Sequence, residues 1–239
     1  MPPTPPNPPA DRGNWPPGSL VAQLTEAQRT ALLDAGTAIT FADDDVLVRQ
    51  GDAGDWVYVL LSGLVKISVA AEKGSETNET TVAVRSRGDL IGEFAVLDGA
   101  PRIATARAVG VVGAIRISSA RFATFGEQYP EAQATITRSL VDKLRASTRR
   151  HVAERTWGAR ERIAQVLYDL AAAYGERTAN GTVVIPLPIT QQELGQLAGV
   201  AVSTTERILG ELRNEGVIAT RYREVAVRDM VSLDSLRFP

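Results

Sequence analysis

The chain has 239 residues, of which 44% are hydrophobic and 23% charged, and its formal net charge is −2 at pH 7. It contains no cysteine and a single histidine, His151. The absence of cysteine excludes disulfides, thiolate zinc sites, cysteine-held iron–sulfur clusters and cysteine nucleophiles. A histidine-rich metal site or a Ser-His-Asp triad would depend on that one histidine. We therefore expect no catalytic residue and no metal site.

The segment 1–19 is rich in proline and has neither the basic region nor the apolar core of a signal peptide. This composition predicts a disordered or polyproline-like tail, with a proline-rich ligand for a partner domain as the alternative. Apolar runs elsewhere are shorter than the ~18–20 residues of a membrane span, so no membrane partner is expected.

A short helix is predicted from Thr25 to Ala35, with Thr25 as N-cap, Gln28 in the capping-box position and Gly36 as the stop. From residue 37 to 119, short apolar or β-branched runs alternate with glycines at intervals near ten residues, which predicts a small all-β sandwich or barrel. The polar segment Glu72 to Thr80 is interpreted as a long hairpin loop. We assign 20–129 to a β-roll.

A long helix is predicted over 130–157, starting at Pro130. Its apolar stripe is narrow, and at ~1.5 Å per residue the helix is ~40 Å long, more than a small domain needs. The stripe consists of Ile136, Leu140, Leu144, Ser147 and His151. Such a seam favours pairing with a second copy of the chain, and the alternative is a single amphipathic helix packed on its own domain.

The remaining region, 158–239, alternates helices and short strands. The predicted helices are Ala159–Tyr174, Gln191–Leu197 and Val202–Leu212, and the predicted strands are Thr182–Leu187, Val217–Arg221 and Glu224–Arg228, with a turn at Asn180–Gly181. The second and third helices follow each other closely.

These two helices have the pattern of a helix-turn-helix. Small Gly195 suits a close helix crossing, Gly199 marks the turn, and Thr190 with Glu193 predicts a capping box. Leu194, Ala198, Val200 and Ile208 fill the apolar positions between the helices. The alternative is an αα-hairpin in a protein–protein module, and the full spacing together with a basic hairpin favours DNA.

The N-terminal residues of the second helix of such a motif face base edges in the major groove, and Arg207 suits bidentate contact with guanine. From Arg155 onward arginines and acidic residues are equal in number, so net charge does not support DNA binding and the placement of the arginines must. The candidate DNA-binding residues are Thr190, Gln191, Val202, Ser203, Thr204, Glu206, Arg207, Arg221 and Arg223.

Two segments resemble the CRP/FNR family of bacterial transcription regulators: Gly88 to Arg102 (GDLIGEFAVLDGAPR), which is similar to a cyclic-nucleotide phosphate-binding cassette, and Ile189 to Gly199 (ITQQELGQLAG). The resemblance covers about 20–235. It implies an α+β fold with a jelly-roll-like β-roll sensor, a dimerisation helix over 130–157 and a winged helix-turn-helix over 158–239.

The resemblance also implies a ligand site. Gly92 and Glu93 match the positions that hold a ribose 2′-hydroxyl, Arg102 matches the arginine that pairs with the cyclic phosphate, and Ser147 and Thr148 match hydroxyls that contact the purine across both subunits. The full implied set is Gly92, Glu93, Phe94, Arg102, Ile103, Ala104, Ser147 and Thr148. The implied effector is cAMP, with cGMP open, and no cofactor is required.

Two positions depart from the family pattern. Ile103 stands where nucleotide binders carry Ser or Thr, and losing that hydroxyl should weaken phosphate binding by roughly 1.5–3 kcal/mol. Val202 and Ser203 stand where the best-known members carry an Arg-Glu pair, which predicts a different operator. A ligand-independent regulator, a sensor for another ligand and, more remotely, a nucleotide-regulated enzyme remain as alternatives.

The partners implied by the resemblance are double-stranded DNA, a second copy of the chain and RNA polymerase, in the bacterial cytoplasm. A ligand that touches both the roll and the dimer helices would link the sensor to the spacing of the two DNA-reading helices, because its contacts can differ between two arrangements.

Overall fold

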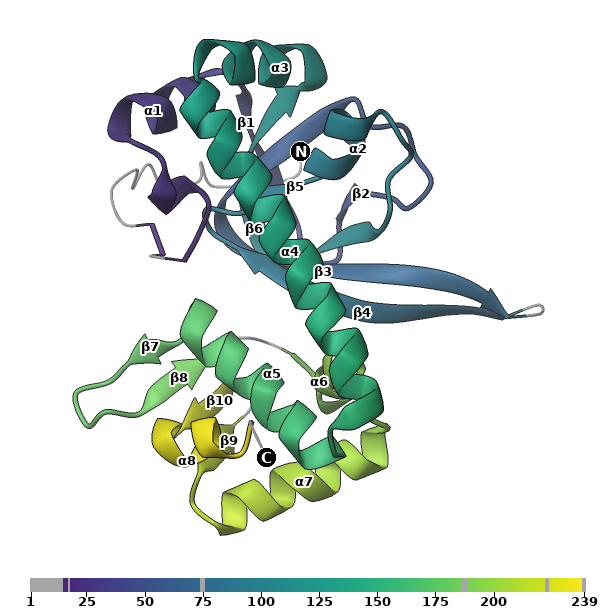
Figure 1. Ribbon diagram of the computed structural model, residues 1–239, viewed down its shortest axis with the longest axis vertical. Coiled ribbons are helices and arrows are strands. Elements are labelled where there is room, and N and C mark those ends of the chain that lie inside the picture. Colours follow the sequence, from purple (N-terminus) through teal and green to yellow (C-terminus); the bar gives the residue numbers. More distant parts are fainter. Residues whose placement is uncertain (1–14, 17, 74–75, 186–188, 222–223, 238–239) are drawn as a thin grey trace, which may run out of the picture. The chain divides into compact units, whose positions relative to one another are not determined.

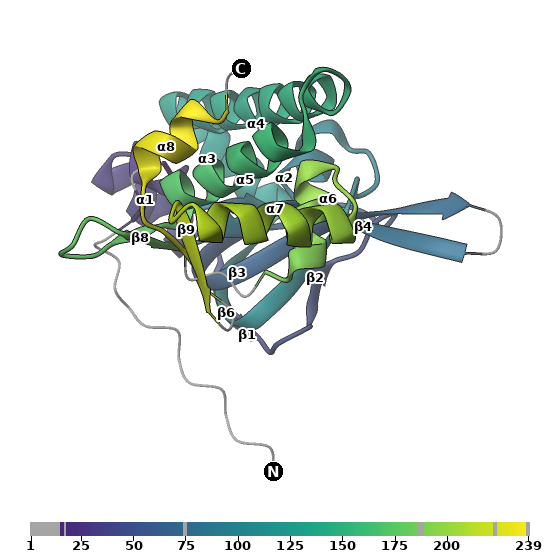
Figure 2. The same ribbon diagram turned by 90° about the horizontal axis from the view of Figure 1, so that it is seen from below.

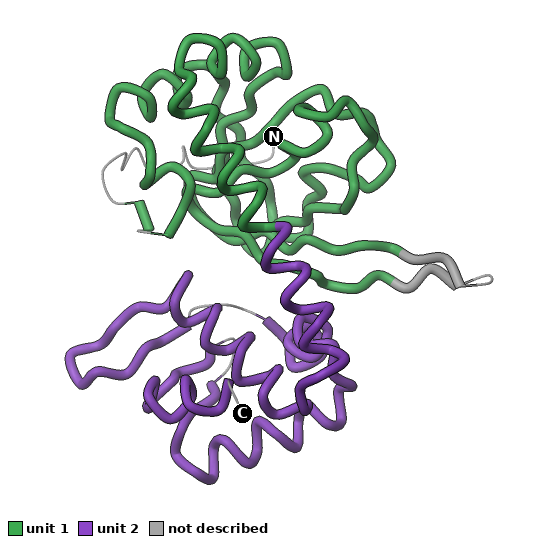
Figure 3. The backbone as a smooth tube through the Cα atoms, viewed as in Figure 1, with its two compact units in different colours: residues 1–143 green, residues 144–239 purple. Residues whose placement is uncertain are grey.

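The computed structural model describes residues 15–16, 18–73, 76–185, 189–221 and 224–237, with only the backbone described at 71–73 and 76–78. The chain forms two compact units, 1–143 and 144–239 (Figure 3). Within the described ranges, no helix is long and apolar enough to cross a membrane. The predicted tail falls largely on residues 1–14 and 17, which lie outside these ranges.

Among the described residues, the first unit consists of an antiparallel sheet and four short helical elements. Its strands are β1 (Thr37–Phe41), β2 (Val46–Val48), β3 (Trp56–Lys73), β4 (Glu76–Ser86), β5 (Leu90–Ile91) and β6 (Thr105–Ser118). Its helices are the 3-10 helix η1 (Val21–Gln23), α1 (Glu26–Asp34), α2 (Glu93–Asp98) and α3 (Ser119–Gln128), and the first half of α4 (Pro130–Thr156) also belongs to it.

The sheet has the order β1-β6-β3-β4, with β2 added to β6 and β5 added to β3. Alternate residues of β3 face opposite sides, as a strand requires. Val57 and Val59 pack with Ile117, Leu32 of α1 and Phe122 of α3. Tyr58 and Leu60 pack on the other side with the apolar residues of β1, β2 and β5. The predicted β-rich N-terminal domain is confirmed, and one of its two cores is closed by helices.

The N-terminal segment is tied to this unit. Thr25 and Gln28 form the predicted capping box of α1, with the Thr25 hydroxyl accepting from the Gln28 amide. Trp15 and Ser19, which the sequence assigned to the tail, are 7% and 6% exposed. Arg87 stacks on the Trp15 ring at 4.6 Å. The segment directly before η1 is therefore part of the core.

The interpretation of Glu72 to Thr80 as a loop was wrong. β3 continues to Lys73, β4 begins at Glu76, and Glu72 pairs with Thr77 in a regular antiparallel register. Figures 1 and 2 show the two strands leaving the roll as a long arm. Its polar residues concealed the strands because hydrogen bonds between backbones need no buried face.

The helices α2 and α3 were also not predicted. Both are short, with six and ten residues, and α2 lies inside a glycine-punctuated segment that was interpreted as strands and turns. Gly36 has a different role from the predicted helix stop, since α1 ends at Asp34 and a Cβ on Gly36 would collide with Ile115 and Ile117 of β6.

The long helix α4 matches its predicted range within one residue, and the boundary between the two units falls at Lys143, inside it. Ile136 is fully buried in the first unit. Further along, Val141, Leu144 and Val152 are 41%, 65% and 52% exposed. The apolar stripe is thus covered near its start and open over its later turns.

The second unit contains the rest of α4 and a small winged arrangement of helices and strands. The elements are α5 (Ala159–Tyr174), β7 (Glu176–Arg177), β8 (Val183–Ile185), α6 (Gln191–Ala198), α7 (Val202–Asn214), β9 (Ile218–Arg221), β10 (Glu224–Val227) and α8 (Met230–Ser235). The sheet order is β7-β8-β10-β9. β7 and α8 were not predicted, and the predicted strand end at Leu187 lies outside the described residues. The predicted helical and winged C-terminal region is otherwise confirmed.

Candidate functional site

The turn at Gly92 shapes the predicted ligand cassette. Gly92 has φ +84° and caps the N-terminus of α2. A Cβ at this position would collide with Nη1 of Arg102. Glycine is needed both for the left-handed backbone and for the approach of the arginine. The local sequence therefore brings Gly92, Glu93 and Arg102 together, as predicted.

Arg102 is a buried cation with protein partners. Its side chain donates from Nη1 to the carbonyl of Gly92 and from Nη2 to the carbonyl of Trp56, the latter over 2.6 Å. The residue is only 4% exposed. Burial lowers the pKa of the guanidinium, while nearby Tyr58 and Asp55 raise it, and arginine stays charged at neutral pH. Arg102 is thus a fixed positive charge held by two neutral backbone carbonyls.

Glu93 is equally buried and forms an ion pair. It is 2% exposed, and its Oε1 accepts from Nζ of Lys143 over 2.6 Å. The same Nζ donates to the carbonyl of Leu90 over 3.2 Å. Lys143 was not among the predicted site residues, because in the sequence it is only a lysine beside the apolar stripe of a helix. The contact joins the cassette to α4 within the first unit.

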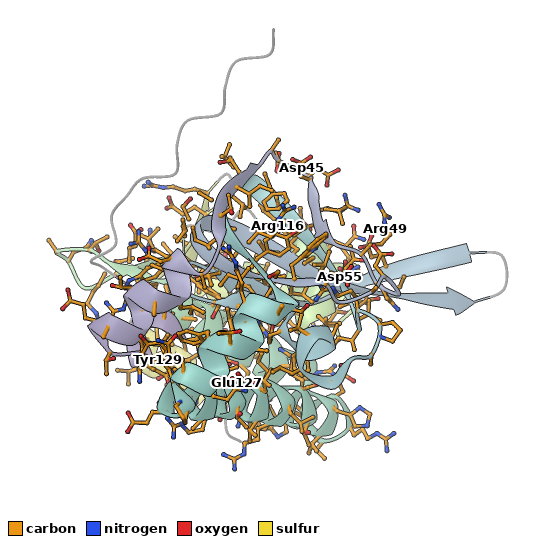
Figure 4. All side chains as sticks on the ribbon, turned by 90° about the horizontal axis from the view of Figure 1, so that it is seen from above. Asp45, Arg49, Asp55, Arg116, Glu127 and Tyr129 are labelled. Atoms are coloured by element: carbon orange, nitrogen blue, oxygen red, sulfur yellow. The ribbon has the colours of Figure 1, made fainter. Side chains whose placement is uncertain are left out.

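Aromatic side chains border the arginine. Tyr58 is 4% exposed and packs edge-on against Phe41 with ring centroids 5.5 Å apart. Burial raises the pKa of its phenol, an effect opposed by Arg116 and Arg102. Arg116 lies over the Trp56 ring at 5.0 Å, and Figure 4 labels it together with Asp55, which precedes β3. These side chains set the polarity around Arg102, and sequence reasoning missed them.

The other predicted ligand residues are less enclosed. Ile103 is 58% exposed, whereas Phe94 and Ala104 are half-buried. Ser147 and Thr148 belong to the second unit and are exposed, with the Thr148 hydroxyl donating to the carbonyl of Leu144 over 3.1 Å.

The helix-turn-helix geometry follows the predicted pattern. Thr190 Oγ1 accepts from the Glu193 amide at 3.1 Å, Glu193 Oε2 accepts from the Thr190 amide at 2.8 Å, and Gly199 ends α6 with φ +62°. A Cβ on Gly195 would lie 2.6 Å from the carbonyl oxygen of Val200 and 2.7 Å from Oγ1 of Thr205. The capping box and the close crossing at Gly195 are both confirmed.

The predicted DNA-facing residues share one exposed face of α7. Val202, Ser203, Glu206 and Arg207 are exposed and Thr204 is half-buried. Ile208, Leu209 and Leu212 are buried on the opposite face. Because the polar side chains at the start of the helix are exposed to solvent, they would be accessible to the major groove of DNA.

Residues from two other elements lie near α7. One cavity is lined by Gln191 of α6, its N-cap Thr190, Arg221 of β9 and Leu209 of α7. β9 and β10 form the predicted hairpin, pairing Arg221 with Glu224. Arg223 lies outside the described residues.

An ion network that the sequence did not reveal spans α5 and α7. Glu211 Oε1 contacts Nη1 of Arg207, and its Oε2 lies 3.3 Å from Nη1 of Arg160. Arg160 Nη2 also lies 2.5 Å from Oε2 of Glu215. We refer to Arg160, Arg207, Glu211 and Glu215 as the Glu211 network. The i,i+4 spacing of Arg207 and Glu211 was the only sequence signal.

Comparison with known proteins gives matches for both units. A cyclic nucleotide-binding domain model matches residues 38–129, and a Crp-like helix-turn-helix domain model matches residues 161–236. A CRP-like cAMP-activated global transcriptional regulator of Mycobacterium tuberculosis is 26% identical over 192 residues, which is 80% of this chain and 84% of that protein.

Two solved structures have the same fold. FixK2 from Bradyrhizobium japonicum matches with a TM-score of 0.73 and 17% identity, over 85% of this chain and 98% of the other. A CRP/FNR family transcriptional regulator from Thermus thermophilus matches with a TM-score of 0.66 and 25% identity, over 85% and 99% of the two chains.

Proposed function

The chain belongs to the CRP/FNR family of transcription regulators, and from this premise we propose that it binds DNA under the control of a cyclic nucleotide, with cAMP as the first candidate. Arg102 pairs with the cyclic phosphate and Glu93 accepts from the ribose 2′-hydroxyl. Ser147 and Thr148 contact the purine. The name of the M. tuberculosis relative favours cAMP over cGMP, which stays the second candidate.

One observation carries the ligand half of this proposal. A guanidinium that is 4% exposed lies against the turn of Gly92, beside a carboxylate that is 2% exposed. The two carbonyls to which Arg102 donates are neutral, so the buried guanidinium can still gain from an anion, whereas Glu93 would exchange part of its contact with Lys143. An anion for the arginine and a hydroxyl donor for the carboxylate are the two groups that a cyclic nucleotide presents.

The DNA half rests on α7 and the residues around it. Ser203 and Arg207 are exposed at the start of the helix, and Thr190 and Gln191 begin the helix before it. In the proposal, Arg207 reads a guanine, while Thr190, Arg221 and Arg223 contact the backbone. Because the Arg-Glu pair of the best-known members is replaced by Val202 and Ser203, the operator differs from theirs.

We further propose that two copies associate through α4. Val141, Leu144 and Val152 leave apolar surface open on this helix, and a second helix with the same stripe would cover it. A two-fold dimer places its half-sites about one helical turn of DNA apart, ~34 Å. Such a regulator acts in the cytoplasm and meets RNA polymerase at its promoters.

A specific observation supports the alternative of a regulator that needs no nucleotide. Both cassette charges already have partners within the chain, since Arg102 donates to two carbonyls and Glu93 pairs with Lys143. Ile103 contributes no hydroxyl. In this alternative the roll is a structural element, and operator affinity is the same with and without nucleotide.

Calorimetric titration of the purified protein with cAMP and cGMP distinguishes a nucleotide-controlled regulator from one that needs no nucleotide. We expect saturable binding of cAMP by the wild type, at least tenfold weaker binding by Arg102→Lys, which keeps the charge but loses the planar fork, and no binding by Arg102→Ala. Arg107→Lys, an arginine of β6 that pairs with Asp44, is the matched control and should bind as the wild type does. Absence of binding at millimolar nucleotide would favour the alternative.

A further inference from the structure

The Glu211 network divides one carboxylate between two arginines of different elements. Oε1 of Glu211 faces Arg207 within α7, and Oε2 faces Arg160 of α5. Arg160 also forms an ion pair with Glu215, the C-cap residue of α7. The exposed fractions of the side chains are 62% for Arg207 and 38% for Glu211, so the pair is open to solvent and to a ligand.

The contacts of Arg160 and the pair within α7 differ in how strongly they are favoured. Glu211 and Glu215 lie in the last turns of α7, where negative charge opposes the helix dipole, and Arg160 neutralises them from outside the helix. The pair within α7 has arginine before glutamate, the weaker order for an i,i+4 pair. Arg160 therefore fixes Glu211, and the fixed carboxylate restrains Arg207.

This restraint matters where α7 meets DNA. On a duplex of random sequence Arg207 can gain only a phosphate, and it must leave Glu211 to do so. At the proper guanine it gains a bidentate contact in a fixed geometry. Leaving Glu211 costs the same free energy on either duplex, so the exchange alone weakens both complexes and does not by itself change the preference. A fixed carboxylate beside the arginine also repels phosphates that approach without the guanine.

We infer that Glu211 is a positioning residue that holds Arg207 in the free protein and raises the selectivity of α7 for its operator by weakening non-specific binding. The inference rests on the proposed DNA-binding function. Glu211 touches no base itself in this account, and it acts through Arg207.

The test starts with the full-length protein and selection of its preferred duplex from a random DNA pool, with and without cAMP. Binding to that duplex and to a scrambled duplex is then measured by fluorescence anisotropy over a salt series. The variants are Glu211→Gln, which removes the charge, and Glu215→Gln, which removes a charge of the same network that Arg207 does not touch. Thermal unfolding of each variant verifies folding.

For Glu211→Gln we expect tighter binding to the scrambled duplex, with a salt slope steeper by about 0.9, the value for one additional phosphate contact. Its advantage over the wild type should shrink by about threefold between 50 and 200 mM salt. Its preference for the selected duplex should fall, and adding Arg207→Gln should abolish the difference. Glu215→Gln should match the wild type.

Equal effects of Glu211→Gln and Glu215→Gln would overturn the inference, because they would show a general charge effect. An unchanged Glu211→Gln would overturn it as well. If the wild type selects no duplex at all, the proposed DNA binding fails and the inference falls with it. If the wild type selects a duplex and the variants behave alike, only the inference fails.

Discussion

The cassette and α7 use the same two residue types under opposite conditions. In the cassette, Arg102 and Glu93 are 4% and 2% exposed. On α7, the side chains of Arg207 and Glu211 are 62% and 38% exposed. Buried charges must keep partners at all times, so a ligand has to exchange with partners that the chain already supplies. At exposed charges, water and salt ions compete with the protein partners, so replacing one partner by another changes the free energy only a little. If both proposals hold, we expect a ligand of the cassette to displace partners within the chain, and DNA at α7 to compete with water and salt.

The largest expected change in stability comes from removing one cation from each region. Lys143→Met leaves the carboxylate of Glu93 buried and unpaired, and we expect the free energy of unfolding to fall by about 3 kcal/mol. Arg160→Met breaks two exposed pairs of the Glu211 network, and we expect a change of at most about 1 kcal/mol. Urea denaturation at neutral pH measures both.

A double variant isolates the cause. Adding Glu93→Gln to Lys143→Met removes the unpaired charge and should restore much of the lost stability. The contrast between the two regions would not hold if Lys143→Met and Arg160→Met were equally mild, or if the double variant stayed as unstable as Lys143→Met.

The sequence predicted the regular elements where a local signal exists. The capping boxes at Thr25 and Thr190 and the small residue at Gly195 each satisfy a requirement of the nearby backbone, and each is found as expected. The long helix was predicted within one residue because its periodicity and Pro130 agree. Gly92 and Arg102 were placed together by resemblance, since ten residues separate them along the chain.

Features that depend on distant residues could not be predicted in this way. Lys143 meets Glu93 across 50 residues, and Arg160 meets Glu211 across 51. The residues next to Lys143 and Arg160 in the sequence do not indicate which carboxylate each will meet. The β3–β4 arm was missed for another reason: the segment from Glu72 to Thr80 (EKGSETNET) contains no apolar side chain, so the alternation that predicts a strand is absent.

The exposed end of the cassette gives the second test. Ile103→Thr introduces a hydroxyl where the family's nucleotide binders have one, and we expect cAMP to bind tenfold to a hundredfold more tightly, roughly 1.5–3 kcal/mol. Ile103→Val is the matched control, since valine has nearly the shape of threonine without the hydroxyl. Calorimetric titration of the three proteins compares them. Equal gains for threonine and valine would attribute the effect to size and would remove the phosphate contact from the account.

The smallest expected effects separate packing from charge on the DNA-binding side. A methyl group on Gly195 meets the backbone carbonyl of Val200 at 2.6 Å, and backbone yields less easily than a side chain, so Gly195→Ala should destabilise by about 1–3 kcal/mol. Gly210 lies in α7 with only Nη2 of Arg213 near, at 3.7 Å, so Gly210→Ala should stabilise by about 0.5–1 kcal/mol. Thermal unfolding shifts of opposite sign would show that the close approach of α6 and α7 is fixed by backbone contact, independently of the Glu211 network. A neutral or stabilising Gly195→Ala would mean that the turn can open, and that the exposed charges, rather than the crossing, position Arg207.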